Sequence, residues 1–156
     1  MLGCGAPVVR GMLNPGVRAG MREATRVTTW TDVINYVRTR YEVLEETDSW
    51  LRFRLETAGE RTQQVAVHHM PDPEGPELIE ISSPVGWADK IDLRRLLELA
   101  GTAPVGGAAV VDGVALLKHT VPLADLSIRH EFEHPLKLVV AHADDFERKL
   151  TQADQF

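Results

Sequence analysis

Residues 77–100 constrain the fold more than any other stretch, because a strand, a break and a helix follow one another in them. A mostly aliphatic run, residues 78–82, predicts a strand, and the Pro/Gly-containing residues 84–86 then interrupt the pattern. An amphipathic helix follows, with Asp92 as its expected N-cap and Gly101 as its expected C′ residue. We expect this helix to bury four apolar residues at helical spacing: Leu93, Leu96, Leu97 and Ala100. Such a unit must place a helix against one face of a sheet.

The residues before this unit predict one helix and two strands. Apolar residues recur at helical spacing over residues 30–41, with Thr29 or Thr31 available as the N-cap. Residues 50–56 and 63–68 alternate apolar and polar side chains, which is typical of strands with one buried face.

The residues after the unit predict a hairpin and a closing helix. Two runs rich in strand-forming residues, 108–111 and 114–121, flank Asp112-Gly113, which is the typical pattern of a type I′ turn. Residues 132–150 carry apolar side chains four and three positions apart, which predicts a long amphipathic helix.

These elements together predict an α+β domain over residues 29–151, in which an antiparallel sheet of about five strands carries helices on one face. The expected order is α-β-β-β-α-β-β-α. Residues 41–46 either add a further strand or continue the first helix. We expect residues 152–156 to form a tail.

Residues 1–28 differ from the rest of the chain and are expected to form a leader. The first 27 residues carry four arginines and one glutamate, a net charge of +3 in a chain of formal net charge −6. A targeting peptide would be similarly rich in arginine, but secretion and a lipoprotein signal ending at Cys4 both require an apolar segment, which this stretch lacks. We favour a flexible leader or an over-extended start, with Met12 or Met21 as the first residue.

Composition narrows the class of protein and its compartment. The acidic balance argues against a nucleic acid or an anionic membrane as the partner, because both require a basic surface. The single cysteine, Cys4, permits no internal disulfide, and no apolar run approaches the roughly 18 residues of a membrane span. We therefore expect a cytoplasmic protein.

Side chains typical of protein-binding surfaces occur at two places. Trp50, Arg52 and Arg54 alternate along one predicted strand, with Gln64 as a neighbour, and Trp and Arg are enriched at binding hot spots. Trp87 lies between a strand and a helix, where it can anchor a dimer or a client protein. The alternatives are that the first helix covers Trp50, that the arginines are solvated or paired with Glu56 and Glu80, and that Trp87 caps the core.

The segment HEFEH at residues 130–134 matches the H-E-x-x-H pattern, in which two histidines hold zinc and the glutamate is a general base. Pro135 argues against this function, because the residue before a proline avoids the α conformation. His142 follows His134 by eight residues and is poorly placed as a third ligand. We interpret the segment as a solvated helix entrance. A zinc-dependent hydrolase is kept as an alternative, built on His130, Glu131 and His134.

Other candidate chemistry is weaker. His68 and His119 are predicted to point to opposite faces of the sheet, which argues against a shared metal or pH-sensing site. The sequence contains no Ser/His/Asp arrangement, P-loop or dinucleotide-binding fingerprint. We therefore expect no enzymatic activity and no cofactor.

Five segments carry a resemblance to a known family: Gln64-Val65-Ala66-Val67, Ile79-Glu80-Ile81-Ser82-Ser83-Pro84-Val85-Gly86, Leu96-Leu97-Glu98-Leu99, Leu116-Leu117-Lys118-His119-Thr120-Val121-Pro122-Leu123 and Ala143-Asp144-Asp145-Phe146. With the order of elements, they make residues 30–150 similar to the type III secretion chaperone-like superfamily, and more closely to its branch of small bacterial proteins called putative sensory transduction regulators. These motifs mark the fold and are not catalytic. The small residues 106–109 depart from the pattern, because the family usually has a bulkier strand there.

The resemblance implies a homodimer that binds other proteins or peptides and catalyses no reaction. It also implies that the helix behind residues 82–86 contributes to the dimer contact, and it names no particular client. Our hypothesis is a non-catalytic binding module, chaperone-like or regulatory. A zinc-dependent hydrolase and a structural subunit of a larger complex are the alternatives.

Overall fold

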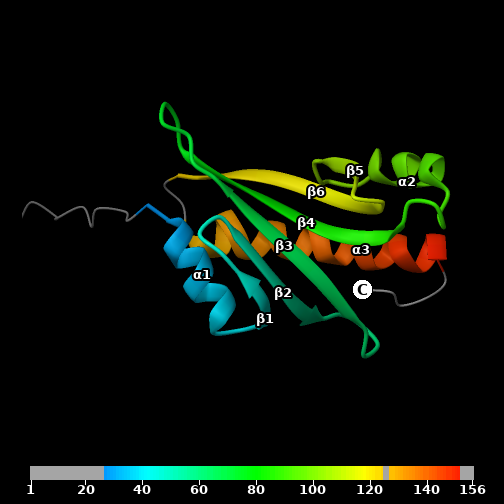
Figure 1. Cartoon of the computed structure of the whole chain (residues 1–156), viewed down its shortest axis with the longest axis horizontal. Coiled ribbons are helices and arrows are strands. Elements are labelled where there is room, and N and C mark those ends of the chain that lie inside the picture. Colours follow the sequence, from blue (N-terminus) through cyan, green and yellow to red (C-terminus); the bar gives the residue numbers. More distant parts are fainter. Residues whose placement is uncertain (1–26, 125–126, 152–156) are drawn as a thin grey trace, which may run out of the picture.

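The computed structural model of the chain describes residues 27–124 and 127–151, so that the expected tail and all but two residues of the expected leader lie outside the described residues. Within these ranges the chain forms three α-helices, one π-helical turn and six strands (Figure 1). The elements follow in this order: α1 (Trp30–Arg38), β1 (Glu42–Glu46), β2 (Trp50–Glu56), β3 (Thr62–Met70), β4 (Glu77–Trp87), α2 (Leu93–Ala100), β5 (Gly107–Val111), β6 (Val114–Leu123), the π-helical turn η1 (Arg129–Glu133) and α3 (His134–Thr151).

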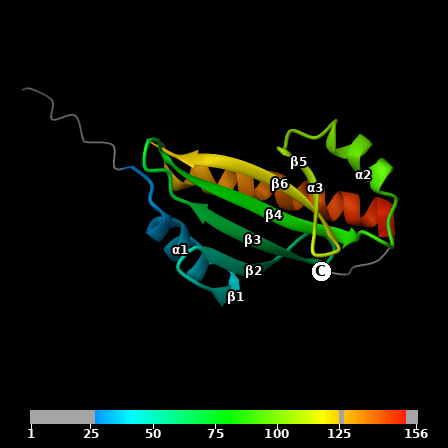
Figure 2. The ribbon, with the colours of Figure 1, turned by 45° about the horizontal axis from the view of Figure 1, so that its top comes forward.

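All six strands form one antiparallel sheet in the order β1-β2-β3-β4-β6-β5 (Figure 2). The predicted α+β fold with an antiparallel sheet is confirmed. The predicted number of about five strands was one too few, and the order α-β-β-β-α-β-β-α lacked the first strand, β1. Residues 42–46 form β1 and do not continue α1, which ends at Arg38. A register shift between Val43 and Glu45 interrupts the pairing of β1 with β2, and this irregularity removes the alternation that would have identified the strand.

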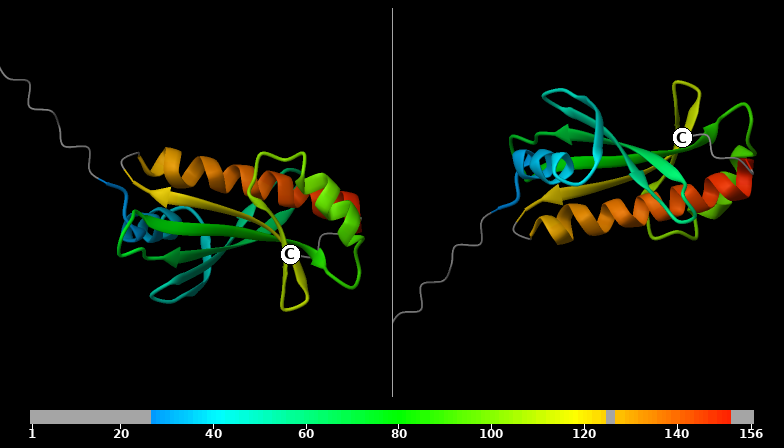
Figure 3. Two further views of the ribbon diagram at one scale, coloured as in Figure 1. Left: turned by 90° about the horizontal axis from the view of Figure 1, so that it is seen from above. Right: turned by 90° about the horizontal axis from the view of Figure 1, so that it is seen from below.

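The helices leave one face of the sheet bare. Figure 3 shows α3 along one side of the sheet, while the turn between β5 and β6 projects to the other side. The Trp30 ring of α1 stacks on His69 of β3 at 5.1 Å, and Tyr36 meets Phe132 of η1 edge-on at 5.6 Å. These contacts place α1 on the same side as α3, and α2 packs beside β5 and the end of α3.

The core lies between the helices and the covered face of the sheet. Alternation along β2 and β3 directs Leu51, Phe53, Val65 and Val67 inward, as predicted. The stripe predicted for the last helix is also confirmed, with Leu150 only partly buried. Its buried members are Phe132, Leu136, Val139, Ala143 and Phe146.

The prediction for α2 was wrong in its rotation. Leu96 and Ala100 are buried together with Leu99, whereas Leu93 and Leu97 are 37% and 62% exposed. The helix contains more leucine than one buried stripe needs, so the spacing alone allowed two rotations, and packing beside β5 and α3 selects one.

Local signals at the element ends are mostly confirmed. Thr29 and Asp32 form a reciprocal capping box at α1, and the Asp92 side chain accepts a hydrogen bond from the Arg95 N–H at the start of α2. Asp112 and Gly113 have φ values of 50° and 80°, as a type I′ turn requires. Gly101 ends α2 with φ of −63°, so the left-handed conformation expected of a C′ glycine is absent there.

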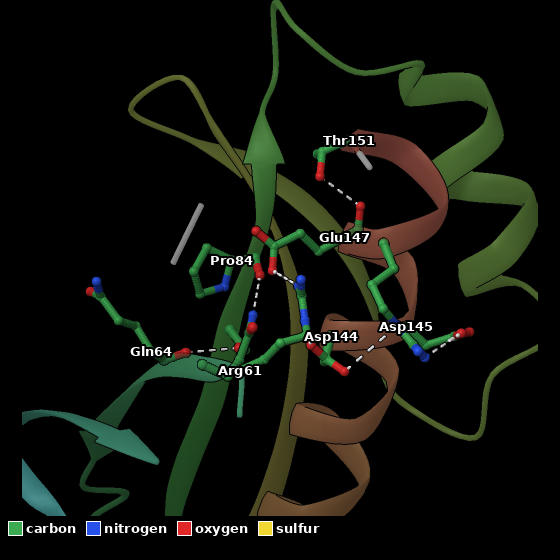
Figure 4. Close-up of polar contacts among 10 residues, drawn as sticks. Arg61, Gln64, Pro84, Asp144, Asp145, Glu147 and Thr151 are labelled. Carbon is green, nitrogen blue, oxygen red and sulfur yellow. Dashed lines mark hydrogen bonds and ion pairs between the residues drawn. The ribbon is translucent and has the colours of Figure 1, made fainter. Parts of the chain in front are cut away.

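A buried ionic cluster joins the β2–β3 turn to α3 (Figure 4). The Arg61 Nε donates to Asp144 Oδ1 at 2.7 Å, and its Nη2 donates to Glu147 Oε2 at 3.0 Å. The Glu147 side chain is 0% exposed. Beside this cluster, the buried Gln63 Nε2 donates to the Pro84 carbonyl at 2.6 Å. Charges in such a place are tolerated only when they are paired, so this cluster fixes the position of α3 on the sheet.

We predict that Arg61→Ala lowers the free energy of unfolding by about 3 kcal/mol, because it removes the nearest cation from two buried carboxylates and leaves Asp144 only Arg148, at 3.8 Å. The matched control is Arg95→Ala, whose guanidinium contacts Glu98 at 3.3 Å with both side chains more than half exposed. The control should cost less than about 0.5 kcal/mol. Chemical denaturation followed by circular dichroism measures both, and equal losses would contradict the structural role of Arg61.

Candidate functional site

The bare face of the sheet carries a groove of about 630 Å³, which we call the open-face groove. Strands β2, β3, β4 and β6, the last residue of β5 and the β5–β6 turn line it. The outward-pointing lining side chains are Trp50, Arg52, Gln64, Ala66, His68, Glu80, Ser82, Pro84, Val111, Asp112, Val114, Leu116 and Lys118. None of the three helices contributes to the lining.

Strand pairing arranges these side chains in rows across the sheet. The central row runs from Arg52 on β2 through Ala66 and Ser82 to Lys118 on β6. The next row begins with Trp50 opposite His68, which is opposite Glu80. Two long cationic side chains therefore stand on either side of a floor made of two small residues.

Trp50 lies on the open face and is not covered by α1. Its ring stacks on the His68 imidazole with a centroid distance of 4.2 Å and an interplanar angle of 9°. The tryptophan buried beneath α1 is Trp30, the first residue of that helix. It is 8% exposed, and its indole N–H donates to the Asp48 carbonyl at 3.0 Å. Trp50 is thus held in place by its own sheet while part of its surface stays accessible.

The arginines of β2 pair with β1 and not with Glu56 or Glu80. Arg52 lies 3.5 Å from Glu45 and Arg54 lies 3.8 Å from Glu42, measured between the charged atoms. Arg52 and Glu45 are both more than half exposed, so their ion pair is weak and an incoming carboxylate can compete for the arginine.

Glu80 instead contacts Lys118, with an Nζ–Oε2 distance of 2.8 Å. This pair links β4 to β6 across the floor of the open-face groove.

Of the predicted binding residues, Trp50, Arg52 and Gln64 line the open-face groove, whereas Arg54 and Trp87 do not, although Arg54 lies opposite Gln64 in the pairing of β2 with β3. Arg54 lines a second groove, of about 890 Å³, between the β1–β2 edge and α3. Trp87 ends β4 opposite Val114, is 47% exposed and lies outside the lining of the open-face groove.

Sequence reasoning missed the β6 wall of the open-face groove. Leu116 and Lys118 alternate with the inward-pointing Leu117 and His119, so their outward direction was readable from the sequence. Their position opposite β2 was not, because it depends on β6 pairing with β4.

The H-E-x-x-H segment does not converge on a common point. Glu131 is 6% exposed and its Oε1 accepts a hydrogen bond from the Ala124 N–H at 2.7 Å, whereas His130 and His134 are exposed. The expectation that Pro135 would push His134 out of the α conformation was wrong, since His134 has φ of −68° and ψ of −50°. The wider π-helical turn before it accommodates the proline, which has no N–H to donate.

Two side chains near this segment have shifted pKa values. The hydrogen bond from Lys137 lowers the pKa of the Glu133 carboxyl, with a smaller contribution from the Tyr36 hydroxyl. Burial raises the pKa of the Tyr36 phenol, and the neighbouring Tyr41 and Glu133 raise it further. Glu133 is therefore a carboxylate at neutral pH, which fits a charged helix entrance.

The other candidate histidines stay apart. His68 points to the open face beside Trp50, and His119 lies on the covered face opposite Ile81. Strand β4 separates their strands. Among residues 27–124 and 127–151, no group of three or more His, Cys, Asp or Glu side chains is placed to hold a metal ion.

The chain matches no model of a known protein family and no curated protein. Across the part of the chain that the structure describes, no helix combines the length and the apolar character needed to cross a membrane.

Proposed function

We propose that the protein is a non-catalytic binding module, chaperone-like or regulatory, that acts in the cytoplasm as a homodimer. It holds a segment of another protein in the open-face groove. The observation that carries this proposal is the partly buried Trp50, stacked on His68 at the edge of a floor of small residues. Tryptophan and arginine dominate the energy of protein–protein contacts when they lie in preformed hollows, and Trp50 and Arg52 occupy such a place.

The resemblance to the type III secretion chaperone-like superfamily supports the same class of function. Its members hold segments of client proteins and form homodimers. The single cysteine, Cys4, is consistent with a reducing compartment.

The two edges of the sheet differ in a way that supports self-association. Edge strand β1 carries three glutamates and an irregular register, both of which discourage pairing with another chain. Edge strand β5 has the sequence Gly-Ala-Ala-Val-Val and no charge, and Val110 is 50% exposed. The exposed leucines of α2, Leu93 and Leu97, extend this apolar surface, because α2 packs beside β5. We therefore place the dimer contact on β5 and α2.

We predict that the double variant Trp50→Ala/Arg52→Ala binds partner proteins about thirtyfold more weakly than the unaltered protein, which corresponds to roughly 2 kcal/mol. Partners are recovered by affinity purification from cell extract, and each purified partner is then titrated by calorimetry. The control variant Arg129→Ala/Lys149→Ala removes two exposed cations from the helical side and should bind normally. A folded Trp50/Arg52 variant with unchanged affinity for every partner would show that the surface is wrong.

We also predict that the unaltered protein sediments with twice its chain mass of 17.3 kDa. Leu97→Glu should yield the monomer, because a charge would then be buried at the contact. The matched control, Leu44→Glu, changes a leucine that is 43% exposed on the β1 edge and should leave the dimer intact. A monomeric unaltered protein, or a Leu97→Glu dimer, would refute the proposed contact.

A further inference from the structure

We propose that two copies of the chain pair their β5 strands edge to edge, antiparallel about a two-fold axis at Ala109, and so join their two sheets into one. This inference rests on the homodimer of the proposed function and specifies the backbone groups that form its contact. Three features of β5 lead to it: the direction of its free backbone groups, the sizes of its side chains and its lack of charge.

The β5–β6 turn determines which backbone groups of β5 bond to β6. Residues 112–113 form a two-residue turn with positive φ at both positions, so Val111 and Val114 are the hydrogen-bonded pair that closes the hairpin. Hydrogen-bonded and non-hydrogen-bonded pairs then alternate along the two strands, because the register of β5 with β6 has no shift. The direction of each backbone group in β5 follows from this turn.

Two residues of β5 direct their backbone groups away from β6. By the alternation, Gly107 and Ala109 bond to β6 as Val111 does, whereas Ala108 and Val110 do not. The N–H and C=O groups of Ala108 and Val110 therefore face the free edge of the sheet, where β5 is the last strand. Such an edge is a template for pairing with another strand.

Antiparallel pairing about Ala109 satisfies all four of these groups. Ala108 of each copy then lies opposite Val110 of the other, and each pair exchanges two hydrogen bonds. Ala109 lies opposite itself in the non-hydrogen-bonded pair between them. An axis at Ala108 or Val110 would instead leave one outward-facing residue opposite the turn or the loop before β5, so the axis at Ala109 is favoured.

The side chains of β5 fit the same arrangement. Val111 would lie beside Gly107 of the second copy and Val110 beside Ala108, so each larger residue meets a smaller one. The space beside Gly107 is open, since a Cβ there would meet no described atom within 4 Å other than those of its chain neighbours. Val110 and Val111 are 50% and 45% exposed, and the pairing would cover part of both.

The surroundings of β5 favour a second copy as its partner. The strand carries no charge that would be repelled across a two-fold axis. Because that axis is perpendicular to the sheet, α2 of each copy lies on the same side, and the exposed Leu93 and Leu97 of both helices would lie beside the axis. Burial of these leucines would add to the free energy of the backbone pairing.

The opposite edge of the sheet fits β5 less well. Strand β1 carries Glu42, Glu45 and Glu46, and its register is interrupted. Pairing of β5 with β1 of another copy would also repeat without closing and give filaments, whereas β5 with β5 closes as a dimer. The two open-face grooves of that dimer lie on the same side of the joined sheet.

The register is tested with single cysteines in a Cys4→Ser background, which removes the chain's single natural thiol. Ala109→Cys places two thiols in a non-hydrogen-bonded pair, where the Cα atoms are about 4.5 Å apart and a disulfide can form. The control is Val111→Cys, which is more exposed than position 109 but would lie about 14 Å from its counterpart. After mild oxidation, non-reducing electrophoresis should show at least about tenfold more disulfide dimer for Ala109→Cys.

The backbone contact is tested at Val110, whose N–H bonds to no group of its own copy in this arrangement. Val110→Pro removes that donor, and edge strands tolerate proline at such a position, so the variant should fold and sediment as the 17.3 kDa monomer. Val110→Ala keeps the N–H and should remain a dimer. If Val110→Pro does not fold, as judged by circular dichroism, amide exchange replaces it. The Ala108 and Val110 amides should then exchange at least about a hundredfold more slowly in the unaltered protein than in Leu97→Glu.

The outcomes separate this inference from the proposed function. A dimer in which Val111→Cys cross-links as well as Ala109→Cys, or neither does, would overturn the edge pairing but retain the homodimer. A folded Val110→Pro dimer, or unprotected amides in the unaltered dimer, would overturn the edge pairing in the same way. A monomeric unaltered protein would reject both the pairing and the homodimer, while the Trp50→Ala/Arg52→Ala titration still decides the binding surface.

Discussion

The structure depends on the attachment of its helices to one face of a single antiparallel sheet. Arg61 joins the β2–β3 turn to α3 through Asp144 and Glu147, and the apolar stripe of α3 covers the same face. Because these buried contacts hold the helical layer on one side, the other side of the sheet is bare. The open-face groove is a direct consequence, since its floor consists of the outward side chains of strands whose inward side chains form the core. The arrangement of the core thus determines where Trp50 and Arg52 are displayed.

Periodicity predicted the parts of the fold in which one face is buried and the other is not. Strands β2 and β3 and helix α3 follow this rule, and their inward residues were predicted from spacing alone. The rule failed at β1, where an irregular register and an exposed Leu44 remove the alternation. It failed also at α2, because Leu93 and Leu97 are apolar without being in the core. Both failures fall on elements at the margins of the sheet, where tertiary packing and not local pattern decides burial.

The candidate site was predicted only on β2, through Trp50 and Arg52, and on β3, through Gln64. Alternation placed Trp50, Arg52 and Arg54 on one face, and Arg54 does lie opposite Gln64 in the β2–β3 register, but its side chain lines the second groove beside α3. The opposite wall required the strand order, since Lys118 is 66 positions from Arg52 in the sequence and yet shares its row. The motif match was less informative than this geometry. Residues 130–134 match the H-E-x-x-H pattern, but the Glu131 carboxylate accepts a hydrogen bond from the Ala124 N–H.

The most direct test of the binding surface follows the three tryptophan indole N–H signals by ¹H–¹⁵N NMR while a binding partner is added. Trp50 lies in the open-face groove, Trp30 is buried and donates to the Asp48 carbonyl, and Trp87 is exposed elsewhere on the sheet. The Trp50 signal should move in proportion to bound partner, while the Trp30 signal stays in place as an internal control. A bound partner that leaves the Trp50 signal unchanged and shifts that of Trp87 or Trp30 would contradict the assignment of the open-face groove.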